Sequence, residues 1–308
     1  INGGDVKNQG VELGLSWNDQ IGKDFTYSVG ANLAYNHNEV GSIPTEDGII
    51  HGATNQIYSN AEEFYRAENG HAIGYFWGFK TAGIFQNKQE INDWIAAGNG
   101  VYQSSVQPGD VKYVDVNHDG VIDAKDKVDL GNGLPKYTFG FNINLGYKGF
   151  DLSLNATGAA GFQIAQSYRD PNSSQSNYSR QILNRWTGEG TSNRIPRVTY
   201  GDVGNWQFSD LYLQDGDYIR LQNITLGYDF KRLISWKGLS KLRLYVQAQN
   251  LFTLTKYDGM DPEIGSYNGT DGNKQNSDGT TNQTWVSGVD MGYYPHPRTF
   301  IVGINLAF

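Results

Sequence analysis

Apolar and polar residues alternate along seven stretches of the chain, which predicts β-strands. In residues 137–147, Tyr, Phe, Ile and Leu hold every second position, and Thr, Gly and Asn stand between them. Because successive side chains of a strand point to opposite faces, each stretch has one apolar and one polar face. In 218–230 the alternation slips near Gln222, which indicates a β-bulge. The other stretches are 11–17, 25–36, 150–160, 242–254 and 299–308.

Two architectures accommodate such strands. A soluble β-sandwich has one face in water and one in the core, whereas a transmembrane β-barrel turns its apolar face to lipid and its polar face to a lumen. The polar faces here are rich in Gly, Asn, Ser and Thr, as suits a lumen. Aromatic residues at strand ends favour the barrel, because aromatic girdles mark both lipid–water interfaces. They are Trp17, Phe25, Tyr35, Tyr137, Tyr147, Phe150, Tyr228 and Phe230. We therefore predict an all-β fold, part of a transmembrane antiparallel barrel.

Composition narrows the classes of function. The chain has 308 residues and no Cys, so disulfides and Cys–metal sites are excluded. A net charge of −8 argues against a nucleic-acid partner held by phosphate contacts. No apolar run is long enough for a transmembrane helix. A hydropathy scan alone would suggest a soluble protein, but it overlooks strands that are apolar only at every second residue.

The lengths of the connections predict the topology. Residues 18–24 and 148–149 are short turns and 231–241 is moderate, whereas 37–136, 161–217 and 255–298 are long. Bacterial barrels have short periplasmic turns and long extracellular loops. We therefore expect the three long connections, including 37–136 as an excursion without a crossing, outside the cell, and the C-terminus in the periplasm. Seven strands is an odd number, so we expect residues 1–308 to be the C-terminal part of a larger barrel.

The last predicted strand carries a possible assembly signal. Its outward row ends on a C-terminal aromatic residue and consists of Phe300, Val302, Ile304, Leu306 and Phe308. A final strand of this form resembles the assembly signal of bacterial outer-membrane barrels.

The stretch DVNHDGVIDAKD, residues 115–126, has the spacing of a calcium loop. Calcium takes about six to eight oxygen ligands. We expect side-chain ligands and one backbone carbonyl, that of Val121, from the set Asp115, Asn117, Asp119, Val121, Asp123 and Asp126. Gly120 stands where the loop must turn, and Ile122 should point into an apolar contact. Asp126 replaces the usual longer Glu, and no helix precedes the loop, so this is not a complete EF-hand. The alternative is a solvated Asp/Asn/Gly turn.

Two short helices are expected within the first long connection. Ser59 and Glu62 have the spacing of a capping box. Further on, Ile91, Trp94 and Ile95 share one helical face that ends before Gly98.

Taken together, these motifs resemble the C-terminal third of SusC/RagA-type TonB-dependent outer-membrane transporters of the Bacteroidetes. The resemblance spans almost the whole chain. It rests on VKNQGVELGLSW, IGYFWGFKTAGIFQ, PGDVKYVDVNHDGVIDAKDKVDLGN, LPKYTFGFNINLGYKGFDL, LQDGDYIRLQNITLGYDF, LRLYVQAQNLFTLTKYDGMDPE and YYPHPRTFIVGINLAF.

The resemblance implies a barrel of about twenty-two strands with an internal plug. It also implies a SusD-like surface lipoprotein as partner, energy from the TonB complex, and oligosaccharide or sometimes peptide cargo. The plug, the TonB-contacting segment and the N-terminal strands are expected to lie outside residues 1–308.

Two classes of function remain open. The first is TonB-dependent nutrient uptake; the second is a surface adhesin or glycan-binding β-protein with a calcium-stiffened loop. We find no nucleophile elbow, HExxH motif, P-loop or dinucleotide fingerprint and expect no enzyme. The sequence does not identify substrate-binding residues. Tryptophans in the long connections could stack on sugars, although packing is the commoner role; they are Trp77, Trp186, Trp206 and Trp285.

Overall fold

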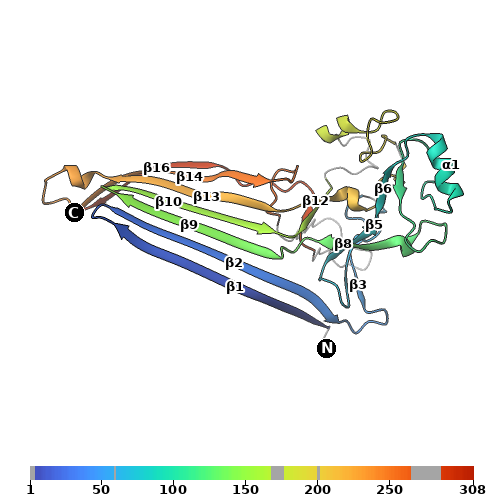
Figure 1. The fold of residues 1–308 in the computed structure, drawn as a ribbon, viewed down its shortest axis with the longest axis horizontal. Helices are drawn as coiled ribbons and strands as arrows, with labels where there is room; N and C mark the ends of the chain where they lie inside the picture. Colours follow the sequence, from blue (N-terminus) through green and yellow to red (C-terminus); the bar gives the residue numbers. More distant parts are fainter. Residues whose placement is uncertain (1–3, 59, 168–176, 200–201, 265–285) are drawn as a thin grey trace.

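The computed structural model describes residues 4–58, 60–167, 177–199, 202–264 and 286–308. Its largest unit is a seven-stranded antiparallel sheet, in which neighbouring strands follow chain order (Figure 1). The strands are β1 (Asp5–Ile21), β2 (Phe25–Ser42), β9 (Tyr137–Tyr147), β10 (Phe150–Ala160), β13 (Tyr218–Asp229), β14 (Lys241–Thr255) and β16 (Thr299–Ala307). The sheet does not close, and β1 and β16 form its edges. The prediction of seven strands belonging to part of an all-β barrel is confirmed.

The register of the sheet separates two unlike faces. One row crosses six adjacent strands on the apolar face: Tyr27, Leu145, Leu152, Leu226, Val246 and Val302. The next row, on the opposite face, contains Ser28, Asn144, Ser153, Thr225 and Gln247. Val302 is 79% exposed and Leu226 is 47% exposed. An apolar row that wide and that exposed suits lipid rather than water.

Local features of the sheet follow the sequence pattern. Against β10, consecutive residues Asn155 and Ala156 pair with Asn223 and Leu221, so Gln222 is the bulged residue of β13, as predicted. Aromatic rings meet across strands near both ends of the sheet. Ring centroids lie 6.4 Å apart for Phe25–Tyr147, 4.5 Å for Phe150–Tyr228 and 5.3 Å for Tyr35–Tyr137.

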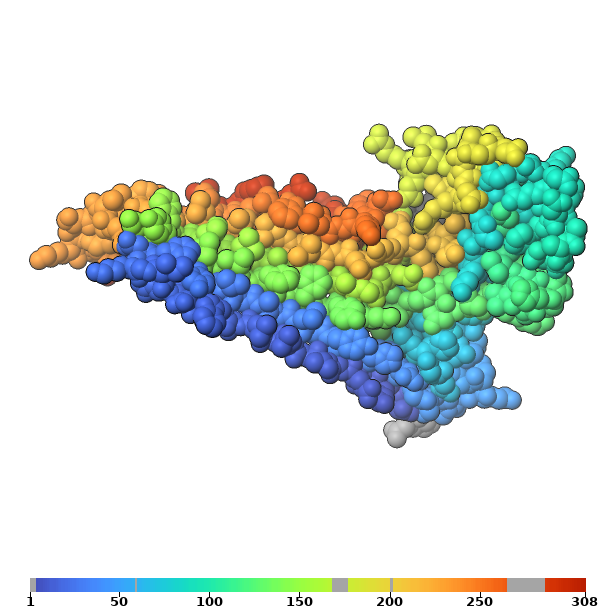
Figure 2. All heavy atoms as spheres, in the orientation of Figure 1, coloured from blue at the N-terminus to red at the C-terminus, as the bar shows by residue number. Residues whose placement is uncertain are grey.

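The three long connections leave the sheet at one end and the short turns lie at the other, together with the C-terminus (Figure 1). We call the described parts of 43–136, 161–217 and 256–298 the first, second and third excursions, and the structure they build the loop lobe. The first and second excursions form one continuous mass, teal and yellow in Figure 2. The turn between β13 and β14 contains η4 (Phe230–Leu233).

Small sheets and short helices make up the loop lobe. One sheet has the order β3-β4-β5-β8, a second β12-β11-β15, and a third pairs β6 with β7. These strands are β3 (Ile49–His51), β4 (Tyr65–Glu68), β5 (Tyr75–Phe79), β6 (Thr81–Ile84), β7 (Val111–Tyr113), β8 (Lys127–Asn132), β11 (Gln163–Gln166), β12 (Leu213–Asp215) and β15 (Val289–Asp290). The helices are α1 (Lys88–Ala96), η1 (Ala124–Asp126), η2 (Arg180–Asn184) and η3 (Asp210–Tyr212). No helix in the described ranges is long and apolar enough to cross a membrane.

The expected helix at 88–96 is confirmed, with Asn87 as its N-cap and Gly98 beyond its end at a φ of 88°. The expected helix near Glu62 is wrong for the residues that the structure describes. Residues 61–64 are irregular and lead into β4, and Glu62 instead forms an ion pair with Lys127. Ser59 lies outside the described residues.

The first excursion begins later than predicted. Strand β2 continues through residues 37–42 to Ser42. The end of β2 packs against the lobe, because Val40 of β2 and the following Ile43 form a buried cluster with Ala67. Burial of apolar area against another layer extends the strand beyond the part that its alternation marks.

Candidate functional site

Asp110 joins the first and second excursions. Its carboxylate is fully buried, and one oxygen accepts hydrogen bonds from Arg197 Nε at 2.6 Å and Asn205 Nδ2 at 2.8 Å. The other oxygen accepts the backbone N–H of Gln107 at 2.8 Å. Asn205 also accepts the backbone N–H of Val111 at 2.9 Å, which fixes β7. Since a buried charge is stable only when it is paired and hydrogen-bonded, this contact determines how the two excursions pack.

Further side-chain contacts run alongside this anchor. Thr81 Oγ1 donates to Asp210 Oδ1 at 2.7 Å, and the backbone N–H of Ile84 donates to Asn193 Oδ1 at 3.0 Å. The backbone N–H of Phe79 donates to the carbonyl of Phe208 at 3.0 Å. The two excursions are therefore one packed unit, although more than 100 residues separate most of these partners in the sequence.

The predicted calcium loop is ordered by its own backbone. Asp115 and Asp126 are buried, with 2% and 0% exposure. Asp115 accepts the N–H of Gly120 at 2.7 Å, and Asp126 accepts those of Val116 at 2.8 Å and Asp123 at 2.9 Å. Such bonds fix the loop's curvature. A carboxylate has about four acceptor positions, so lone pairs remain for an ion.

The other predicted ligands lie toward solvent. Asn117 Nδ2 donates to Asp119 Oδ2 at 3.0 Å, and Lys125 Nζ lies 3.6 Å from Asp123 Oδ2. Val121 is exposed, and its N–H donates to Asp119 Oδ1 at 2.9 Å. The loop thus gathers all six predicted residues in one turn of chain, two of them buried beneath the others. Calcium binding here stays a prediction.

Ile122 points into the lobe, as expected. It is 7% exposed and packs in a cluster with Phe79, Ile84, Val111 and Tyr113. Gly120, at a φ of 80°, allows the reversal that brings Ile122 to this side. The acidic loop is therefore attached to the same apolar cluster that supports the junction of the first two excursions.

A different trio has metal-like spacing. Among the described residues, Asp261, Glu263 and His296 form the acidic or imidazole group whose ligand atoms all lie within 4.8 Å of one another. Arg220 of β13 already forms ion pairs with Asp261 and with Glu263, the latter at 2.9 Å. Because the guanidinium supplies the positive charge, the group acts as an ion-pair latch that holds the third excursion to the sheet.

The latch shifts the pKa of its buried carboxyl group. Burial alone would raise the pKa of Asp261, but backbone N–H groups of His296 and Glu263 and the side chains of His296 and Arg220 outweigh it. The net pKa of Asp261 lies below its usual value. The latch is therefore formed with an ionised Asp261 at neutral pH.

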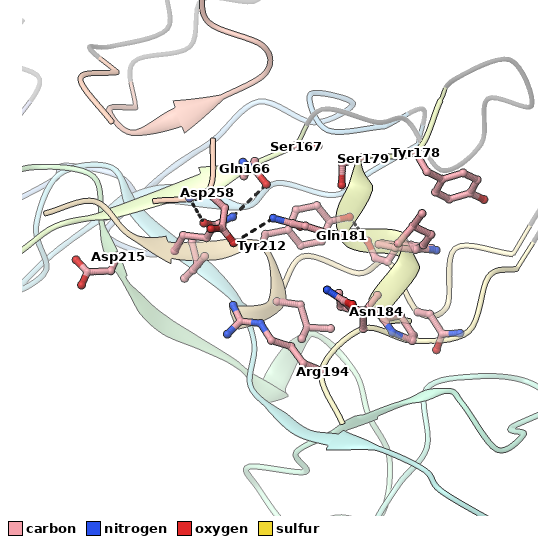
Figure 3. A pocket seen from close by; sticks show the side chains of 18 of the residues that line it. Gln166, Ser167, Tyr178, Ser179, Gln181, Asn184, Arg194, Tyr212, Asp215 and Asp258 are labelled. Carbon is pink, nitrogen blue, oxygen red and sulfur yellow. Dashed lines mark hydrogen bonds between the residues drawn. The ribbon is translucent and has the colours of Figure 1, made fainter. Parts of the chain in front are cut away.

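A cavity of about 560 Å³ opens between the second and third excursions (Figure 3). Its walls come from η2, β11, β12 and residues 194–196 and 256–258. One wall is a hydrogen-bonded row: Gln214 Nε2 donates to Gln166 Oε1 at 3.1 Å, and Gln214 Oε1 accepts the N–H of Asp258 at 3.0 Å. Its volume lies within the range of roughly 300–1,000 Å³ of small-molecule sites.

The tryptophans have different environments. Trp77 lies beneath the Arg66 guanidinium, 3.4 Å from the ring centroid, and Lys127 Nζ is 4.6 Å away, so its ring is occupied by cations. Trp186 packs against the cluster that contains Ile122. Trp206 lines the cavity. Trp285 lies outside the described residues.

Sequence reasoning missed both the cavity and Asp110. The cavity is assembled from several separate segments, none of which carries a motif. Asp110 lies in a Pro-Gly-Asp turn that reads as an ordinary exposed loop. No compositional signal marks the cavity, since Gln166, Gln181 and Gln214 lie in a part of the chain that is about as charged as the rest.

Comparisons with known proteins agree with this architecture. A comparison with protein-family profiles gave no match. TonB-dependent receptor P3 of Formosa agariphila is 30% identical over 308 residues, covering 99% of this chain and 29% of that protein. TonB-dependent receptor SusC of Bacteroides thetaiotaomicron is 27% identical over 315 residues, covering 99% of this chain and 27% of that protein.

Solved structures share the fold. A chain of the RagAB peptide importer in the closed-closed state superposes with a TM-score of 0.68 at 22% identity, covering 100% of this chain and 30% of that one. In the open-open state the TM-score is 0.65 at 21% identity, with 99% and 29% covered. The chain thus shares its fold with a segment of the barrel wall of these solved transporters. It is similar over almost its whole length to SusC/RagA-type TonB-dependent receptors and spans about 27–30% of the length of these relatives.

Proposed function

We propose that the protein containing this chain imports nutrients across the bacterial outer membrane and draws its energy from the TonB complex. The observation that carries the proposal is the exposed apolar row across six strands, backed by a polar row on the opposite face. This arrangement matches a wall between lipid and a polar lumen. The names of the relatives as TonB-dependent receptors support the same reading.

The proposed orientation places the loop lobe outside the cell and the C-terminus in the periplasm. Long excursions and short turns lie at opposite ends of the sheet, and outer-membrane barrels keep their long loops extracellular. The cargo would be oligosaccharide or peptide, handed over by a SusD-like lipoprotein that docks on the extracellular side. The plug and remaining strands would come from outside residues 1–308.

The acidic loop is proposed to hold a structural calcium ion. Its ligand set is Asp115, Asn117, Asp119, Val121, Asp123 and Asp126. The support is the gathering of these oxygen donors in one turn and the anchorage of Ile122 in the lobe. Calcium would offset the mutual repulsion of four carboxylates and stiffen the loop.

The test of import uses the native host. Deletion of the full-length gene should abolish growth on one polymeric nutrient, and complementation should restore it only in cells with a working TonB complex. Equal growth of deletion and parent strains on every glycan and protein source tested would exclude nutrient uptake. Surface display of the protein without any nutrient phenotype would favour the adhesin alternative.

The proposed assembly signal can be tested in the same strain. It comprises the outward row of β16 and the terminal ring, namely Phe300, Val302, Ile304, Leu306 and Phe308. Phe308 is 82% exposed, and its ring centroid lies 6.3 Å from that of Trp236. Phe308→Ser should lower the amount of protein in the outer membrane without changing cargo preference. Normal abundance of this variant would remove the argument.

A further inference from the structure

The cavity between the second and third excursions contains an unsatisfied polar group. Ser167 is 9% exposed, and its Oγ is buried without a hydrogen-bond partner among the described residues. Ser167 follows β11 directly and lines the cavity. A buried hydroxyl without a partner is destabilising, so a ligand that supplies the missing bond is favoured at this position.

The polar lining can both donate and accept hydrogen bonds. Side-chain amides contribute to it through Gln166, Gln181, Gln214 and Asn184. Each amide offers two donors and an acceptor, and each hydroxyl is both donor and acceptor. Asn184 and Ser179 are exposed residues of this lining, and Ser179 does not use its side chain to cap η2. These groups match a ligand whose own groups also donate and accept, such as a sugar hydroxyl.

Formal charges around the cavity cancel. Arg194 and Lys256 carry positive charge, and Asp215 and Asp258 carry negative charge. Asp258 Oδ2 is already bonded by Gln181 Nε2 at 3.4 Å. With two charges of each sign, the cavity offers no net attraction to a charged ligand, which favours an uncharged one.

Aromatic side chains complete the site. Trp206 and Tyr212 both line the cavity, and the Tyr212 hydroxyl donates to the backbone carbonyl of Trp206 at 2.8 Å, which fixes the Tyr212 side chain against the Trp206 backbone. An aromatic face in a cleft presents a large apolar surface at low conformational cost. The apolar face of a sugar ring fits such a surface, while its hydroxyl groups reach the amides.

We infer that this cavity binds an uncharged oligosaccharide segment. The inference rests on the proposed function, since it assigns a cargo class and a contact site on the loop lobe. Trp206 supplies the stacking surface, Ser167 and Asn184 bond the hydroxyl groups, and the Gln166–Gln214–Asp258 row forms the wall behind them.

The experiment uses the full-length protein purified in detergent from outer membranes, with affinities measured by calorimetry. Three probe pools are titrated: short oligosaccharides from starch, cellulose, mannan, xylan and inulin; oligogalacturonates; and short peptides of mixed sequence. Binding is expected from the uncharged pool alone. Trp206→Ala should weaken it by at least about tenfold, and Ser167→Ala combined with Asn184→Ala should weaken it measurably with unchanged thermal stability.

Trp236→Ala is the matched control, because Trp236 is 60% exposed and lies in the turn at the other end of the sheet. Binding only of oligogalacturonates or peptides, or of no pool, overturns the assigned ligand class. Uncharged oligosaccharides that bind Trp206→Ala as tightly as the wild type overturn the site. If TonB-dependent uptake persists after either of these negative results, the proposed function stands and only the oligosaccharide site is overturned. If the protein binds the oligosaccharides at this site but no uptake is detected, the site stands and the proposed function is overturned.

Discussion

The sheet and the loop lobe both contain large apolar residues, but they differ in how far the protein itself covers these residues. On the sheet, Val302 and Leu226 are 79% and 47% exposed. In the lobe, Tyr65, Phe76 and Phe79 are at most 1% exposed. The sheet's apolar row is stable only where lipid replaces water, whereas the lobe carries its own core. An apolar residue in the sequence therefore indicates removal from water in both regions. Whether lipid or protein covers it depends on the residues that surround it in the fold.

The regions also differ in what fixes their geometry. In the sheet, hydrogen bonds between adjacent strands set the register, and the bulge at Gln222 is the one departure between β13 and its neighbour β10. In the lobe, side chains bridge distant segments, as Asn205 and Asp110 do across 95 residues of sequence. Loss of one lobe anchor should therefore disturb the lobe and leave the sheet in place.

The largest expected effect comes from Asp110→Ala. Removal of one partner of a buried ion pair costs about 3–5 kcal/mol, and we expect the low end because Arg197 is partly exposed. Proteases should cut the first and second excursions faster in intact cells, while the amount of protein in the outer membrane stays near normal. Limited proteolysis followed by mass spectrometry measures both.

Asp93→Ala serves as the control for that experiment, since Asp93 is an exposed residue of α1. Equal protection of Asp110→Ala and Asp93→Ala would show that Asp110 does not hold the excursions together. Loss of the whole protein from the membrane would show that sheet and lobe do not respond separately.

The second prediction compares the two faces of one strand. Val246 and Gln247 are adjacent near the middle of β14, and Val246 lies in the exposed apolar row. An Arg in the lipid-facing row near the bilayer midplane costs about 2–4 kcal/mol. Val246→Arg should therefore reduce folded barrel in the outer membrane, and Gln247→Arg should have little effect. Similar losses for both variants would contradict the assignment of the faces.

The same contrast explains how far the sequence predicts the structure. All seven strands of the sheet were expected, because a period of two over seven or more residues is a long signal. The lobe strands are two to six residues long, too short for a period to register. They form because other segments pack on them, and β11 pairs with β15 across more than 120 residues.

The candidate site divides along the same line. The acidic loop consists of twelve consecutive residues, so its ligand spacing can be recognised in the sequence. The prediction that Ile122 points into an apolar contact is confirmed. The cavity and the Arg220–Asp261 latch are non-local, and no short motif contains their partners. Glu62 illustrates the opposite error. Its local capping pattern predicted a short helix, but in the structure Glu62 forms an ion pair with the distant Lys127.

The third prediction concerns calcium in the lobe. Extracellular calcium modules bind at about 0.1–1 mM, and a 0.1 mM site in about 1 mM calcium would stabilise the loop by about 1.4 kcal/mol. Asp119→Ala with Asp123→Ala should abolish calcium-dependent protection near residues 110–130 and leave barrel assembly unchanged. Proteolysis with and without a chelator measures the effect.

Glu46→Ala with Asp93→Ala removes two exposed acidic groups of the lobe elsewhere and should retain full calcium protection. A wild-type loop that is cut equally fast with and without calcium would refute a structural ion. Such a result would leave the solvated turn, stabilised by the backbone bonds of Asp115 and Asp126, as the function of the motif.

The smallest effect on protease protection is expected at the ion-pair latch of Arg220 and Asp261, which holds the third excursion to the sheet, and only at acidic pH. The pKa of Asp261 is lowered in the folded protein. A carboxyl group with a lowered folded pKa stabilises above its unfolded pKa of about 3.9, and this contribution is lost as pH falls through the folded value. The third excursion should therefore keep its protection from about pH 7 to pH 5 and lose it below about pH 4. Pepsin digestion across this acidic range, followed by peptide mapping around residues 256–264, measures the loss. Asp261→Asn cannot ionise, so its cleavage should be fast at every pH tested when it is measured relative to an unfolded substrate at the same pH. A pH profile of Asp261→Asn identical to that of the wild type would show that Asp261 does not control the latch.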